Sequence, residues 1–150
     1  MHIRHLVIIA MCCISSLYLY SNSFSLSSSF GSFKNVTFVK NYDGDTITVN
    51  IPYAPPIIGE NISVRVFGID TPEIKGACPK EKQLAKDTKN YVKYILSKAS
   101  YIDLEDVKRD KYFRILATVK TSEGDLAELL LDKGYAVEYD GGTKSKNWCE

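Results

Sequence analysis

The chain has 150 residues, and its 45% apolar and 25% charged content exclude wholesale disorder and leave room for one domain with a core. Lys and Arg number 19 against 18 Asp and Glu, a net charge of +1, which excludes a strongly basic protein that coats nucleic acid and leaves only local anion binding. The two histidines are His2 and His5, so a histidine general base, a Ser-His-Asp triad and histidine-ligated zinc are excluded from the folded part.

The N-terminal segment has the composition of a targeting signal. Residues 6–33 contain no Asp, Glu, Lys or Arg, and Leu6–Tyr20 is mostly apolar. A membrane-spanning helix needs about 20 apolar residues, so residues 1–23 are predicted to be a signal peptide, with an uncleaved N-terminal anchor as the alternative. Residues 24–33 are a serine-rich lead-in. We therefore expect an exported protein, secreted or periplasmic, that is membrane-anchored only if the segment is retained.

Removal of that segment would leave two cysteines, Cys78 and Cys149. An even number in an exported chain is consistent with one disulfide, which would close a loop of about 70 residues and stabilise the fold by about 3–4 kcal/mol. Two unrelated thiols are the alternative, because the sequence does not show whether they meet.

The remaining domain, residues 34–150, begins with short strand-like segments. Phe38–Tyr42 and Thr46–Ile51 lie on either side of Asp43-Gly44, a dipeptide that predicts a hairpin turn. Residues 52–61, which contain prolines and a glycine, are expected to form a loop. The alternating pattern of Ile62–Ile69 predicts a third strand.

The second half of the domain adds helices and strands. A helix is predicted from Pro79, because apolar residues recur with helical spacing as far as Ala99. Tyr101–Val107 and Ile115–Lys120 are expected strands, and Asp125–Gly134 has the cap and the terminal glycine of a short helix. The chain is thus predicted to be α+β, mainly β. A helix between strands three and four of five, followed by a short C-terminal helix, is the layout of an OB-type barrel.

Carboxylates collect at one end of the predicted hairpin. Antiparallel pairing of the second and third strands places Asp45, before one strand, beside Asp70 and Glu73, after the other. Because like charges at close range repel, a hard divalent cation would fit between them. Pro72 would hold Thr71 extended, with its carbonyl toward the ion. The alternatives are that Asp43 and Asp45 are simple turn formers and that residues 70–73 are a helix-entry motif.

Two arginines border these carboxylates. Arg65 lies in the strand that leads to Asp70, and Arg114 opens the last strand. Arginine suits phosphate oxygens, although an arginine in a strand is often a solvated residue or an ion-pair partner. Lys111 and Tyr112 could add a phosphate contact and a stacking face, or be plain turn residues.

Together these motifs resemble the staphylococcal nuclease-like (thermonuclease) family, over roughly residues 36–139. The residues that carry the resemblance are, in chain order, Asp43-Gly44-Asp45-Thr46, Arg65, Asp70-Thr71-Pro72-Glu73, Asp110-Lys111-Tyr112-Phe113-Arg114 and Leu116-Ala117. The resemblance implies a calcium-dependent phosphodiesterase that cleaves DNA and RNA with little sequence preference.

The resemblance also implies a role for each residue at the predicted site. Asp45 and Asp70 would bind Ca²⁺ through their carboxylates and Thr71 through its carbonyl. Glu73 would act as general base on the attacking water. The two arginines, 65 and 114, would stabilise the charge that develops on the phosphate. This division of labour agrees with what phosphodiester hydrolysis needs: a positioned nucleophile, a cation and donors aimed at the developing charge.

The chain departs from the family pattern at two places. Phe113 replaces the usual glycine between Tyr112 and Arg114, and the sequence reaches Glu150 without the long C-terminal helix of many members. Tyr139 is a candidate for the nucleotide pocket, and a bond between the two cysteines would pin the tail to the loop after Glu73. We expect a monomer with DNA and RNA as substrates and no obligate protein partner. The rival functions are a non-catalytic OB-type module that binds single strands and a calcium-stabilised structural protein.

Overall fold

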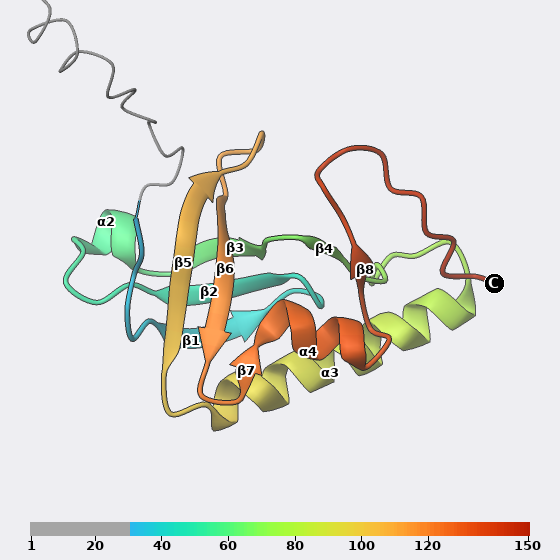
Figure 1. The fold of residues 1–150 in the computed structure, drawn as a ribbon, viewed down its shortest axis with the longest axis horizontal. Coiled ribbons are helices and arrows are strands. Elements are labelled where there is room, and N and C mark those ends of the chain that lie inside the picture. Colours follow the sequence, from blue (N-terminus) through green and yellow to red (C-terminus); the bar gives the residue numbers. More distant parts are fainter. Residues whose placement is uncertain (1–30) are drawn as a thin grey trace, which may run out of the picture.

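The computed structural model describes residues 31–150, so the predicted signal peptide or anchor at 1–23 and most of the predicted lead-in at 24–33 lie outside the described residues. No helix between residues 31 and 150 is long and apolar enough to cross a membrane. Between residues 31 and 150 the structure has eight strands and three helices, and the two longer helices pack against the strands (Figure 1).

The first three strands form an antiparallel meander. They are β1 (Thr37–Asn41), β2 (Thr46–Asn50) and β3 (Ile62–Val66). Tyr42 N donates to Thr46 O at 2.9 Å across the turn, so the predicted Asp43-Gly44 hairpin is confirmed. The predicted loop at 52–61 contains one helical turn, α2 (Pro56–Gly59), which begins with a proline whose φ suits a helix start.

The prediction of one strand over residues 62–69 is wrong. Strand β3 ends at Val66, and the chain turns at Gly68, whose φ of +84° is in the left-handed region that favours glycine. The next residues form the short strand β4 (Ile69–Asp70), which leaves the main sheet and pairs with β8 (Val137–Glu138). This turn directs Asp70 toward the C-terminal part of the chain.

The second half of the chain follows the predicted order. It contains α3 (Pro79–Lys98), β5 (Ile102–Arg109), β6 (Ile115–Thr121), β7 (Gly124–Asp125) and α4 (Leu126–Asp132). Asp125 caps α4, because its side chain accepts hydrogen bonds from the first free backbone N–H groups.

The main sheet has the strand order β1-β2-β3-β6-β5, with β3 and β6 parallel and the other neighbours along this path antiparallel. The segment before β1 joins the two edges, because Phe33 and Leu104 exchange backbone hydrogen bonds of 2.8 Å and Val36 N donates to Ile102 O at 2.8 Å. This strand order is that of an OB-type arrangement, so the predicted fold class is confirmed.

One core fills the space between the sheet and the helices. Figure 1 shows α3 running along one side of the strands, with α4 beside it. The buried face of α3 follows helical spacing, and the strands contribute alternate residues. Buried members include Val92, Ile95 and Leu96 from α3, Val49, Val64, Leu104 and Val119 from the strands, and Leu126 and Leu130 from α4.

The C-terminal tail returns to the start of α3. After β8 the chain forms a wide loop and ends beside the first turn of that helix (Figure 1). Cys149 is disulfide-bonded to Cys78, the N-cap of α3, with a Cα–Cα distance of 6.0 Å. The predicted disulfide is thus confirmed, and the neighbouring Trp148 is 9% exposed.

Candidate active site

A cleft of about 650 Å³ opens over the end of the barrel where β2 begins and β3 ends. The turn after β1, the β3–β4 turn, the β5–β6 loop and the chain after β8 all contribute to its wall. The residues from the predicted site that line it are Arg65, Glu73, Lys111, Tyr112, Arg114 and Tyr139. The predicted metal ligands lie deeper, since Asp45, Asp70 and Thr71 are no more than 3% exposed.

Asp45 lies at the base of this cleft. The β2–β3 register pairs Thr46 with Arg65, so the arginine extends alongside Asp45, and its Nη1 lies 2.5 Å from Oδ1 of that residue. The other carboxylate oxygen accepts from the backbone N and the Oγ1 of Thr71, both at 3.2 Å. The hairpin and the 70–73 segment are therefore joined through one buried acid.

Electrostatics at Asp45 favour an additional positive charge. Burial, followed by the negative charges of Asp43 and Asp70, raises the pKa of Asp45 to about 6, although Arg65 acts to lower it. The aspartate-rich end of the hairpin therefore carries more negative charge than one guanidinium balances.

Asp43 behaves as a turn residue. Its Oδ1 accepts from the backbone N of Thr46 at 2.8 Å and of Asp45 at 3.2 Å, as expected of an aspartate beside a glycine. The backbone of Gly44 lies so close to two threonine side chains that only glycine fits there. A Cβ at this position would lie 2.4 Å from Cγ2 of Thr88 and 2.9 Å from Cβ of Thr71. The turn thus packs directly against α3 and the predicted metal-binding segment.

Asp70 faces two cations. Its Oδ1 lies 2.7 Å from Nζ of Lys144 and 3.7 Å from Nη2 of Arg65. Among the described residues this buried oxygen has no partner with hydrogen-bond geometry, so its interactions are ionic contacts without an aligned donor. Lys144 was not predicted as a site residue, and no local pattern in the sequence distinguishes it from the other lysines of the tail.

Glu73 lies on the loop between β4 and α3. Its carboxylate is about half exposed, and Oε1 lies 2.5 Å from Nζ of Lys144. Glu81 organises this loop from the first turn of α3, because its carboxylate accepts from Glu73 N at 3.3 Å and Ala77 N at 2.7 Å. Glu81 was not among the predicted site residues, although an acid on the buried face of a helix is a detectable signal.

Arg114 is oriented by its own turn. Its Nε donates to Asp110 Oδ2 at 2.7 Å, while Asp110 Oδ1 accepts from the backbone N of Tyr112 and of Arg114. Within residues 31–150 no hydrogen bond or ion pair engages the Nη groups of Arg114, and the guanidinium lies 5.6 Å from the ring centroid of Tyr112. These donors are available to an anion in the cleft.

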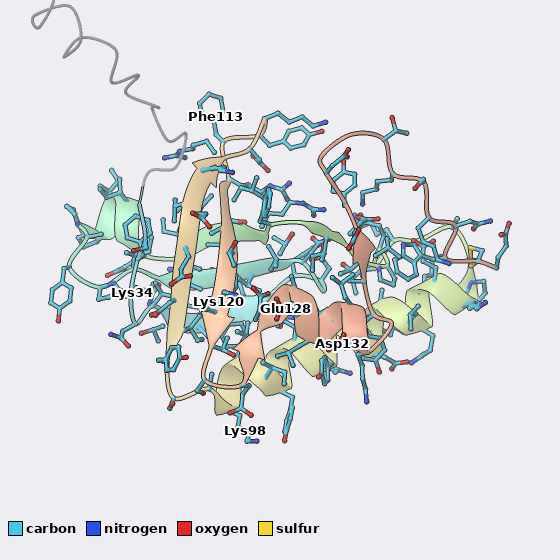
Figure 2. All side chains as sticks on the ribbon, viewed as in Figure 1. Lys34, Lys98, Phe113, Lys120, Glu128 and Asp132 are labelled. Carbon is cyan, nitrogen blue, oxygen red and sulfur yellow. A yellow bond between two sulfur atoms is a disulfide. The ribbon has the colours of Figure 1, made fainter. Side chains whose placement is uncertain are left out.

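Phe113, at the position where the resemblance predicts a glycine, has a left-handed backbone conformation that favours glycine. Phe113 has φ of +62° and is 81% exposed. Figure 2 shows its ring at the outer end of the β5–β6 loop, pointing away from the barrel. The substitution therefore leaves the turn that holds Arg114 intact, at the expense of an unfavourable backbone conformation.

The predicted substrate contacts lie around the rim. Nζ of Lys111 is 5.4 Å from the ring centroid of Tyr112. On the opposite wall, the ring of Tyr139 lies 5.8 Å from the guanidinium carbon of Arg65, and its hydroxyl donates to Gly142 O at 2.7 Å. The cleft thus combines aromatic faces with positive charge.

The donor set at the base of the cleft fits a hard cation. Asp45 and Asp70 are buried carboxylates, the first with a raised pKa, and Oδ1 of the second makes ionic contacts but no aligned hydrogen bond among the described residues; carboxylate oxygens are what Ca²⁺ prefers. The three predicted carboxylates are not drawn into one tight cluster, because Arg65 and Lys144 lie between them. In the part of the chain that the structure describes, the side chains whose potential metal-ligating atoms lie within 4.8 Å of one another are Cys78, Glu81 and Cys149. The sulfurs of the two cysteines form the disulfide.

Comparison with protein families identifies the class of protein that carries this cleft. Residues 63–148 match the family described as staphylococcal nuclease homologue. The match covers more than half of the chain, so the chain belongs to the staphylococcal nuclease family, and the predicted resemblance is confirmed. Arg65, Asp70, Glu73 and Arg114 fall within the match, whereas Asp45 precedes it. A comparison with curated proteins found no match.

Proposed function

We propose that this protein is a calcium-dependent phosphodiesterase that hydrolyses DNA and RNA with little sequence specificity. Membership of the staphylococcal nuclease family supports a nuclease or a nucleic-acid-binding OB module. The observation that favours catalysis is that Arg65, Glu73 and Arg114 border one cleft directly above two buried aspartates. A module that only binds strands has no need for a carboxylate in a phosphate-binding cleft.

In the proposed mechanism, the two arginines hold the scissile phosphate. Arg114 presents Nη donors that have no partner among the described residues, from a turn that Asp110 fixes, and Arg65, which is paired with Asp45, reaches the same cleft from β3. Donors fixed in advance around the charge that develops on phosphorus lower the barrier without reorganising in the reaction. A ring stacked on Tyr112 or Tyr139 would orient the adjacent nucleotide.

Glu73 would remove a proton from the water that attacks phosphorus. Its carboxylate is accessible to solvent at the cleft, and Glu81 fixes the backbone on which it sits. Attack by water breaks one phosphorus–oxygen ester bond and leaves one hydroxyl end and one phosphate end. Asp45, Asp70 and the carbonyl of Thr71 are the candidate ligands of Ca²⁺, which would supply positive charge to the phosphate oxygens and lower the pKa of a coordinated water.

The test is digestion of heat-denatured DNA and of RNA by the purified protein, with calcium or with chelator. We expect cleavage in calcium, no cleavage in chelator, and a loss of at least about a hundredfold in kcat for Glu73→Gln. Glu60→Gln is the matched control, because it makes the same change at an exposed position near α2. Intact substrate under both conditions, with retained binding in a gel-shift assay, would favour the OB-type binding module.

The same proposal includes export. The apolar N-terminal segment and a disulfide are both typical of proteins that function in an oxidising compartment. We propose a secreted or periplasmic monomer that acts on nucleic acid, with membrane attachment only if the N-terminal segment is not removed. N-terminal sequencing of the exported protein would distinguish cleavage before residue 24 from retention.

A further inference from the structure

The C-terminal tail crosses the candidate active site on its way to the disulfide. It leaves the barrel at β8, lines the cleft with Tyr139, Asp140, Gly141 and Lys144, and is bonded through Cys149 to Cys78.

Further contacts fix the end of the tail. Trp148 is buried beside the disulfide, and Lys80 Nζ donates to the backbone O of Glu150. The tail is therefore fixed at both ends, and the residues between them are held over the carboxylates.

One residue of this tail reaches the acids themselves. Nζ of Lys144 lies 2.7 Å from Oδ1 of Asp70 and 2.5 Å from Oε1 of Glu73. The ammonium therefore bridges the proposed metal ligand and the proposed general base. A single positive charge between two carboxylates satisfies the same electrostatic requirement as a bound cation.

We propose that Lys144, held in place by the Cys78–Cys149 bond, is an internal cation that competes with the metal for Asp70 and determines the calcium affinity of the site. The inference rests on the proposed function, because it assigns the same carboxylates to Ca²⁺. A metal ion that binds Asp70 must displace the Lys144 ammonium or share the Asp70 carboxylate with it. The metal ion and the ammonium therefore weaken each other's binding to Asp70. Lys144 also holds Glu73 and is in this sense a positioning residue.

The primary test measures calcium binding without any substrate. Calcium chloride is titrated calorimetrically into the wild-type protein and into Lys144→Gln. We expect the variant to bind calcium at least about fivefold more tightly, the lower end of typical coupling between competing sites. Lys144→Arg keeps the positive charge and should bind within about twofold of the wild type. Lys146→Gln is the matched control, since it removes the same charge from the same tail, and Lys146 contacts the ring of Trp148 and, within residues 31–150, forms no ion pair with an acid.

Thermal unfolding provides a second readout that does not depend on activity. In chelator, Lys144→Gln should melt at a lower temperature than the wild type, because Asp70 and Glu73 lose their shared cation. In saturating calcium this difference should shrink, since the ion replaces the lost charge. A difference that is the same in chelator and in calcium would overturn the inference.

The contribution of the disulfide is tested by a double-mutant cycle. Cys149→Ser should tighten calcium binding in the wild-type background and have no further effect in Lys144→Gln, because the bond acts through Lys144. Equal gains in both backgrounds would show that the tail acts by another route and would overturn the role of the disulfide.

The outcomes separate this inference from the proposed function. Equal or weaker calcium binding by Lys144→Gln, together with calcium-dependent cleavage by the wild type, overturns the internal cation and leaves the nuclease standing. Absence of calcium binding by both proteins overturns the internal cation together with the calcium requirement. Tighter binding by the variant supports the internal cation even if neither protein cleaves nucleic acid.

Discussion

Arg65 Nη1 lies 2.5 Å from Asp45 Oδ1, so a residue expected to contact phosphate is also the counterion of a buried aspartate. The arginine side chain is 13% exposed and the aspartate side chain 3%. A buried ion pair adds little net stability, but the loss of one partner leaves the other charge buried and unpaired. The candidate active-site cleft and the stability of the barrel therefore share one contact.

Replacement of this arginine should destabilise the protein strongly. We expect Arg65→Met to lower the free energy of unfolding in chelator by about 3–5 kcal/mol, because Asp45 then lacks its principal cation. Urea unfolding measures the effect. Arg109→Met is the control, since Arg109 is exposed and its guanidinium donates to the Phe113 carbonyl; its loss should stay below about 1.5 kcal/mol. A comparable loss in the two variants would contradict the prediction.

Replacement of Phe113, whose backbone conformation is unfavourable, should increase the stability of the protein. Phe113 has φ of +62° and is exposed, so Phe113→Gly should raise the free energy of unfolding by about 1 kcal/mol through relief of the left-handed conformation. Phe113→Ala is the matched control, because alanine keeps the Cβ and should give no such gain. A gain of equal size in both variants would assign the effect to the ring instead.

Local patterns in the sequence predict most of the barrel. The Asp43-Gly44 turn, the apolar spacing of α3 and the cap at Asp125 each depend on neighbouring residues, and all three are present in the structure. The break after Val66 was not predicted, because β4 leaves the sheet to pair with β8, a partner nearly 70 residues further along the chain. Periodicity within a segment carries no information about such a distant partner.

At the candidate site, too, local motifs predict some residues, whereas others depend on distant parts of the chain. The motifs predict Arg65, Glu73 and Arg114, and the structure places all three at one cleft. Lys144 was missed because its position depends on the path of the tail between β8 and the disulfide. The disulfide itself is predicted, but the residues around position 144 do not show which part of the tail reaches Asp70.

Glu81 should act on catalysis through the loop that carries Glu73. In Glu81→Gln, one oxygen that accepts from Glu73 N or Ala77 N becomes an NH₂ group, so one of these hydrogen bonds is lost. We expect a lower kcat with little change in KM, because Glu81 is not among the residues that line the cleft, and a loss of about 1–3 kcal/mol in stability. Glu128→Gln, an exposed glutamate in the first turn of α4 (Figure 2), is the matched control. An increase in KM at constant kcat would contradict this assignment.

Asp110, in the turn that orients Arg114, should make the free energy of unfolding vary with pH in the acid range. Burial acts to raise the pKa of Asp110, but hydrogen bonds from Arg114 and Tyr112 outweigh it and hold the pKa below the ordinary value of 3.8. A depressed folded-state pKa stabilises the native state at pH above the unfolded value, and that contribution is lost as pH falls through the folded value.

Asp110→Asn tests this dependence. At pH 7 the variant should be less stable than the wild type by about 1–2 kcal/mol, because the charged hydrogen bonds to Arg114 are lost. Urea unfolding at a series of pH values should show this difference constant down to about pH 5 and shrinking below 3.8. Asp132→Asn is the control, since Asp132 is exposed at the end of α4 (Figure 2) and its replacement should change stability by no more than about 0.5 kcal/mol at any pH. A difference for Asp110→Asn that stays the same at pH 3 and pH 7 would show that its ionised form does not hold the turn.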